Sequence, residues 1–174
     1  GVGDILSIPV SITTDIIALY LVFSIGYNTA KSYKKEGFGA ALIALGSFLL
    51  LTPFSTVIYN ADRTVATPVS GVIPLSAIGA QGMFLAIIVG FVATRLYIFC
   101  LDKGWKISLP EAVPPNVSKM FEQMIPGGIV FAFFLVVRYG MTFTSYETAQ
   151  AFIYGILQVP LSNVGGGMFG AIIY

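Results

Sequence analysis

The sequence predicts an all-α integral membrane protein. We expect about four transmembrane helices, one interfacial amphipathic helix and the start of a further span. Hydrophobic residues make up 56% of the 174 residues and charged residues only 10%, whereas soluble domains usually carry about 25% charged residues. The mean hydropathy is +0.88. The apolar residues also gather in stretches close to the ~20 residues that a helix needs to cross a bilayer.

The first predicted span covers residues 11–30, after a mixed segment at 4–11 that contains Pro9. Asp15 lies near the start of this span. It fits either a polar group in a transport pathway or an interfacial carboxylate beside a helix N-terminus. We favour the interfacial position, because a helix dipole stabilises a carboxylate there and burying a charge in lipid is costly.

The second predicted span covers Phe38–Tyr59, after a charged turn at Lys31–Glu36. Small residues in this stretch allow close packing against neighbouring helices. They are Gly39, Ala40, Ala41, Ala44, Gly46 and Ser47. Pro53 lies in the last third of the span, and we expect it to kink the helix.

The middle of the chain predicts a loop, a short broken segment and a third span. Asn60–Ser70 is polar and lacks hydrophobic periodicity, which indicates a loop. Val72–Gly82 is apolar but interrupted by proline and glycine, as in a short or partly re-entrant segment. Gln81 is expected to cap or bridge helices more readily than to contact a sugar. The third span is predicted at Gly82–Leu101 and the fourth at Met120–Thr142.

A proline-rich stretch at Pro110–Gly128 interrupts the apolar background. Its prolines are Pro110, Pro114, Pro115 and Pro126. Each fixes φ, lacks a backbone donor and restricts the residue before it to extended geometry. We therefore expect a shaped loop over residues 110–116, followed by a helix that starts near Asn116 and is kinked or restarted at Pro126.

The last part of the chain predicts a helix that lies in the membrane interface. Thr144–Glu147 fits a capping box, and the apolar residues after it share one helical face. A helix over residues 145–159 would reach only ~22 Å, which is too short to span. Residues 161–174 begin another apolar stretch. Gly165–Gly170 matches a dinucleotide-binding pattern, but no strand precedes it, so we interpret it as a close helix approach or a hinge.

The composition predicts no catalytic residue, metal site or cofactor. The chain has no histidine and one cysteine, Cys100, which removes the commonest general base and excludes a cysteine cluster for a metal. The net charge of +1 gives no reason to expect a nucleic-acid partner. Most of the basic residues lie at 31–35 and 103–119, so the positive-inside rule places both segments, and with them the proline loop, in the cytosol.

Pro110–Pro115, Phe121 and Ile125–Gly127 resemble the most distinctive stretch of enzyme IIC, the sugar-specific membrane component of the bacterial phosphotransferase system. The resemblance is to the lactose/cellobiose/diacetylchitobiose branch. Met120 departs from that pattern, because a small polar residue is more common there. Gly26–Ala30 and the region from Ile73 to Gly82 also resemble the family, so the resemblance covers the whole chain.

The resemblance implies a multi-pass protein of the bacterial cell membrane. In this family the permease, as a homodimer, takes up a di- or oligosaccharide that is phosphorylated by a phosphorylated IIB partner. The chain would be a fragment of a longer permease: its scaffold and dimerisation half, with 145–159 as a connecting helix and 161–174 as the start of the transport half. No residue matches the histidine and glutamate that recognise the sugar in the family, so the fragment alone would carry no catalytic residue.

The resemblance also places the proline loop near the cytosolic side of the sugar site. We expect the residues of a gate or lip there to be Glu111, Val113, Pro114, Pro115 and Asn116. The alternative is that the prolines only turn the chain between two helices. Two other functions remain open: a scaffold or channel with no sugar role, and a membrane-embedded hydrolase or transferase. The last needs histidine, cysteine or paired carboxylates beside a span, and none is convincingly placed.

The predicted orientation can be tested by cysteine labelling in intact cells. In a Cys100→Ser background, cysteines placed at Lys34 or Lys106 should resist an impermeant thiol reagent, and a cysteine at Arg63 should react. The reason is the uneven distribution of basic residues. The opposite labelling pattern would reverse the orientation and would put the proline loop outside the cell.

Overall fold

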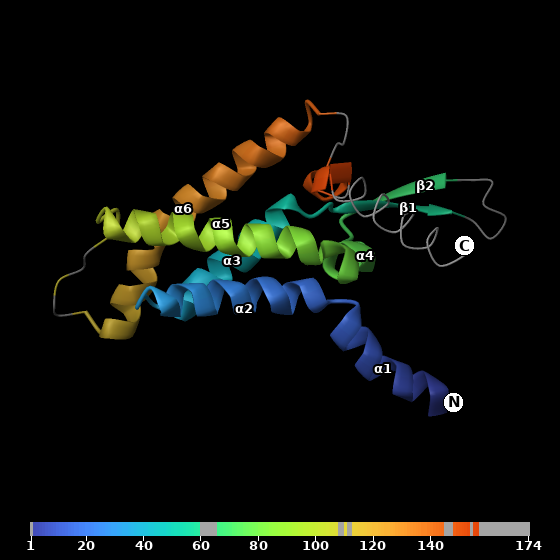
Figure 1. Ribbon diagram of the computed structural model, residues 1–174, viewed down its shortest axis with the longest axis horizontal. Coiled ribbons are helices and arrows are strands. Elements are labelled where there is room, and N and C mark those ends of the chain that lie inside the picture. Colours follow the sequence, from blue (N-terminus) through green and yellow to red (C-terminus); the bar gives the residue numbers. More distant parts are fainter. Residues whose placement is uncertain are drawn as a thin grey trace, which may run out of the picture.

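A computed structural model describes residues 2–59, 66–107, 110, 113–144, 148–153 and 155–156. The described chain is mostly helical. Its elements are α1 (Val2–Thr14), α2 (Ile17–Ser32), α3 (Gly37–Leu51), β1 (Ser55–Tyr59), β2 (Ala66–Ser70), α4 (Leu75–Ile78), a 3₁₀ turn (Ala80–Gly82), α5 (Met83–Asp102) and α6 (Pro115–Met141). Helices α2, α3 and α5 form a bundle that α6 crosses, and the β-hairpin and α1 extend from the same end (Figure 1).

Two helical stretches in the described residues are long and apolar enough to cross a membrane, Ala80–Asp102 and Val117–Met141. The bent pair formed by α1 and α2 makes a third candidate. Helix α3 is apolar but only 15 residues long, which is shorter than a usual span. A mostly helical fold, with apolar helices at the third and fourth predicted spans, is therefore confirmed, whereas the number of about four spans stays a prediction and the described chain is not all-α, because it contains a β-hairpin.

The start of the chain differs from the prediction. Residues 4–11 belong to α1, with Pro9 inside the helix, and the chain bends by 46° between α1 and α2. A proline removes only one backbone donor, and a helix in an apolar setting tolerates this loss when other groups satisfy the freed carbonyls. The half-buried Asp15 lies in the bend just before α2. This position agrees with a carboxylate beside a helix N-terminus.

The second predicted span was wrong in its last third. Helix α3 ends at Leu51, so Pro53 follows the helix and does not kink it. Residues 55–59 instead form β1, which pairs antiparallel with β2, and Val57 lies opposite Pro68. The β-branched run Thr56–Ile58 favours a strand. Part of the predicted Asn60–Ser70 loop is thus β2, and residues 60–65 lie outside the described chain.

Small residues allow α2 and α3 to pack closely, as the sequence predicted. A Cβ atom added at Gly26 would lie 2.9 Å from the Cα of Ala41 and 3.0 Å from the Cβ of Ala44. Any side chain at Gly26 would therefore push against the backbone of α3. Around this contact the largest fully buried side chains are Tyr97, Phe48, Val22, Val89 and Val130, from α2, α3, α5 and α6.

Helix α6 is held against α3 by Arg138. Its Nη1 donates hydrogen bonds to the carbonyl oxygens of Leu50 and Thr52, the second at 3.1 Å. These carbonyls lie at the C-terminus of α3 and have no partner within the helix, so an arginine is well suited to satisfy them. Pro126 lies inside α6, which runs without a break from Pro115 to Met141, and its first turns point in a different direction from its last (Figure 1).

The α2–α3 contact can be tested by Gly26→Ala. We expect the variant to unfold at a lower temperature, with a loss of about 1–3 kcal/mol, because the added methyl group meets backbone atoms that cannot move aside easily. Thermal unfolding of the detergent-purified protein measures this. Gly128→Ala is the matched control, because a Cβ at Gly128 of α6 meets nothing within 4 Å. Equal stability of the two variants would contradict the close approach.

Candidate functional site

A charged cavity of about 250 Å³ lies where the α2–α3 turn, the end of α5 and the first turns of α6 meet. This is the end of the bundle opposite the β-hairpin (Figure 1). We call it the charged cavity. Its lining residues are Lys34, Lys35, Glu36, Tyr97, Leu101, Lys106, Lys119, Glu122 and Gln123. It thus gathers four lysines and two glutamates in a chain that has few charges.

The turn after α2 presents Lys34 in an unusual backbone conformation. The N–H of Lys35 bonds to the carbonyl of Ala30 at 3.0 Å, and that of Lys34 to the carbonyl of Lys31 at 2.9 Å. These two bonds form a Schellman motif, in which glycine normally takes the left-handed position. Here Lys34 occupies it with φ 57°. A side chain in this conformation costs roughly 1–2 kcal/mol.

Glu36 links the start of α3 to α6. Its carboxylate accepts hydrogen bonds from the backbone N–H groups of Phe38 and Gly39 at 2.9 and 2.6 Å. It therefore satisfies two of the free donors at this helix N-terminus. The same carboxylate accepts a bond from Nε2 of Gln123 at 3.1 Å. Gly39 lacks a side chain, and the Gln123 side chain fills the space that a Cβ atom at Gly39 would occupy. Helix α6 can therefore approach α3 closely.

Two ion pairs neutralise part of the remaining charge. Lys35 lies 2.6 Å from Asp102, and Lys106 lies 3.2 Å from Glu122. The second pair joins the segment after α5 to α6 across the loop that connects them. Within the part of the chain that the structure describes, Lys34 and Lys119 have no ion-pair partner. The cavity therefore keeps an excess of positive charge.

Tyr97 and Leu101 of α5 complete the lining. The side chain of Tyr97 is only 1% exposed, and its hydroxyl makes no hydrogen bond to any described residue. A buried tyrosine usually finds a partner for its hydroxyl. The charged cavity is thus lined by a largely buried tyrosine whose hydroxyl is available to a ligand.

None of the described lip residues lines the charged cavity, although the loop lies in sequence between two residues that do, Lys106 and Lys119. Glu111 lies outside the described residues. Val113 is half-buried and its N–H bonds to the carbonyl of Pro110 at 3.0 Å. The exposed Pro114 caps α6, and its carbonyl accepts bonds from the N–H groups of residues 117 and 118. Pro115 and Asn116 are the first residues of α6, one residue earlier than predicted.

The sequence alone does not single out most of the residues that form the cavity. Glu36 falls in a charged turn, and Tyr97 falls in an apolar span. Lys119, Glu122 and Gln123 offered a signal, because residues at positions i, i+3 and i+4 share one face of a helix. A polar face inside an otherwise apolar span indicates a polar partner or a cavity. In the described residues, no group of three or more histidine, cysteine or acidic side chains could hold a metal ion.

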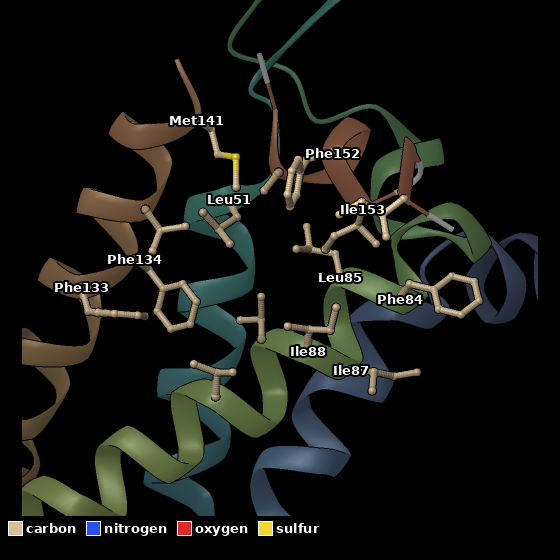
Figure 2. A pocket seen from close by; sticks show the side chains of 15 residues that line it. Leu51, Phe84, Leu85, Ile87, Ile88, Phe133, Phe134, Met141, Phe152 and Ile153 are labelled. Carbon is tan, nitrogen blue, oxygen red and sulfur yellow. The ribbon is translucent and has the colours of Figure 1, made fainter. Parts of the chain in front are cut away.

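A second cavity of about 430 Å³ lies between the end of α3, α5, α6 and residues 149–153 and 156. Figure 2 shows side chains such as Leu51, Phe84, Phe134 and Met141 around it. All of its lining residues are apolar. Sugar hydroxyls need fixed hydrogen-bond partners to offset their desolvation, so this apolar cavity has no means of orienting a sugar.

The whole chain, residues 1–174, matches the family described as "Phosphotransferase system, EIIC". It is 36% identical over 170 residues to the "PTS system cellobiose-specific EIIC component" of Geobacillus stearothermophilus, covering 98% of this chain and 38% of that protein. It is 37% identical to the "PTS system oligo-beta-mannoside-specific EIIC component" of Bacillus subtilis (strain 168), covering 92% and 35%. The chain thus spans little more than a third of these relatives.

The fold is also similar to a solved structure. The crystal structure of the transporter that is the IIC component from the N,N'-diacetylchitobiose-specific phosphotransferase system superposes with a TM-score of 0.86 and 36% sequence identity. The match covers 97% of this chain and 39% of that chain.

The role of Glu36 at the charged cavity can be tested by Glu36→Ala. The variant removes an N-cap acceptor and leaves two donors of α3 unsatisfied, so we expect a loss of about 0.5–2 kcal/mol in the free energy of unfolding. Asp102→Ala is the control, because it removes an exposed carboxylate at the same end, and exposed pairs contribute only about 0–1 kcal/mol. Thermal unfolding compares the two. A larger loss in Asp102→Ala would refute the capping role.

Proposed function

The chain belongs to the phosphotransferase system EIIC family, and we propose that it forms the scaffold half of a sugar permease in the bacterial cell membrane. The complete permease would take up a di- or oligosaccharide of the cellobiose, lactose or diacetylchitobiose type. The family match over residues 1–174 carries this proposal. The names of the relatives support the sugar class, because they specify cellobiose, oligo-β-mannoside and N,N'-diacetylchitobiose.

A phosphorylated IIB protein or domain would be the partner that delivers the phosphoryl group as the sugar enters. IIB is expected to meet the permease on its cytosolic side, where the positive-inside rule places the proline loop and the charged cavity. This chain would contribute architecture and not chemistry to the transfer. We also propose that two copies of the permease associate, as the family resemblance implies.

Within this permease, we propose that the proline loop forms the lip or gate of the sugar site. The loop includes Glu111, Val113, Pro114, Pro115 and Asn116. Two features support the proposal. The loop joins α5 to α6, which are the two longest apolar helices described. It is also held between two cavity lysines, Lys106 before it and Lys119 after it.

The geometry of the described part of the loop favours a fixed shape. The hydrogen bond between Val113 and Pro110 closes a turn, and Pro115 occupies the first position of α6, where a missing N–H costs nothing. Consecutive prolines at 114 and 115 restrict the chain more than a simple connection requires. A lip built in this way would hold its position while a sugar passes.

The lip can be tested by replacing Pro114 and Pro115 together with alanine in the complete permease. The change frees φ at both positions and restores two backbone donors. We expect uptake of radiolabelled disaccharide to fall at least several-fold, while expression and membrane insertion stay normal. Pro68→Ala is the control, because Pro68 is an exposed proline in β2 at the other end of the bundle. Unchanged uptake in the double variant would show that the loop only connects two helices.

A further inference from the structure

We propose that the charged cavity binds a phosphate group. The phosphate would come from the headgroup of an anionic phospholipid or from a free phosphate ion or ester in the cytosol. The same chemistry recognises both sources, because each presents a compact anion with several hydrogen-bond acceptors. This inference concerns binding only and does not depend on the proposed sugar uptake.

The charge balance of the cavity leaves two lysines for a ligand. The Glu36 carboxylate keeps its charge but is stabilised by the α3 N-terminus and by its three hydrogen-bond donors. Glu122 is paired with Lys106, and Lys35 with Asp102. Lys34 and Lys119 approach the cavity from different elements and are unpaired among the described residues. An anion between them would gain two charge-assisted interactions without breaking an existing one.

The backbone at Lys34 gives a second, independent observation. Glycine is the residue that suits the left-handed position of a Schellman motif, yet the chain carries a lysine there with φ 57°. Folding alone would favour glycine. Strained backbone positions tend to gather at functional sites, and here the strained residue is one of those that line the cavity.

Tyr97 supplies a third observation of a different kind. Its side chain is 99% buried by area and lines the cavity with a hydroxyl that no described residue bonds. A phosphate oxygen is a strong acceptor for such a donor. The cavity also lies at the end of the bundle, where basic pockets between transmembrane helices meet lipid headgroups. Two unpaired lysines and one tyrosine hydroxyl therefore belong to the lining of the same cavity.

The experiment compares two double variants of the complete permease in phosphatidylcholine nanodiscs. Lys34→Gly with Lys119→Gln removes the two unpaired cavity lysines. Lys31→Gln with Lys103→Gln removes the same charge from the same end of the bundle, outside the cavity, where these lysines lie over Tyr27 and Phe99. Binding is measured in two arms. One titrates inorganic phosphate, and the other replaces part of the lipid with phosphatidylglycerol; ligand-dependent thermal shift and retained lipid are the readouts.

We expect the wild type and the outer-lysine variant to bind in at least one arm, and the cavity variant to bind at least tenfold more weakly in that arm. A response to phosphatidylglycerol alone identifies the lipid as the source, and a response to inorganic phosphate identifies the free ion. Equal loss in both double variants would show diffuse surface charge and overturn the proposal. So would the absence of binding in both arms.

Whether the cavity variant, Lys34→Gly with Lys119→Gln, still folds is measured separately. Lys34→Gly relieves the left-handed strain, so the unliganded unfolding temperature of this single variant should not fall. If the double variant fails to fold, Tyr97→Phe replaces it, because it removes only the hydroxyl. We expect Tyr97→Phe to weaken phosphate binding several-fold, and unchanged affinity in that variant would overturn the proposal.

Discussion

The close approach of α2 and α3 at Gly26 is the constraint on which the rest of the structure depends. The absence of a side chain brings the two helices nearly to backbone contact at Ala41, and this leaves a short turn of residues 33–36 to connect them. That turn carries Lys34 and Glu36. Because Glu36 caps α3 and also bonds Gln123, the position of α6 follows from the same contact. Helix packing in the apolar region therefore determines which charges meet at the bundle end.

The sequence predicted the long apolar helices well and the shorter elements poorly. Helices α5 and α6 have enough length and apolarity to be recognised without knowledge of their neighbours. The hairpin was missed because Ser55–Tyr59 is apolar in a chain where apolar residues are everywhere, so hydrophobicity could not distinguish a strand from a helix. Residues 4–11, predicted only as a mixed segment, belong to a helix that contains Pro9. In both cases the secondary structure depends on packing against the rest of the chain more than on the local preference of the residues.

The charged cavity could be predicted only in part, for a physical reason. The turn at 31–36 and the polar residues of the first turns of α6 are visible in the sequence, but they lie 87 residues apart where Glu36 meets Gln123. Their meeting depends on how closely α3 and α6 pack, which a single sequence does not contain. Tyr97 could not be identified from the sequence for a different reason, which concerns its residue type and not its distance along the chain. An aromatic residue in an apolar span is usually core, and only its unpaired hydroxyl beside a cavity distinguishes it.

The two ends of the bundle differ in what they leave available to a ligand. At the hairpin end, Arg138 is used in bonding the last carbonyls of α3, and the neighbouring cavity has only apolar lining. At the other end, carboxylates cap the helix or pair with lysines, and two lysines and a tyrosine hydroxyl remain. Polar groups that the fold has already satisfied cannot bind a ligand without breaking a bond. Of these two cavities, only the charged cavity offers a polar ligand groups that the fold has left free, and it lies at the end that carries the proline loop, which is also the end that the distribution of basic residues assigns to the cytosol.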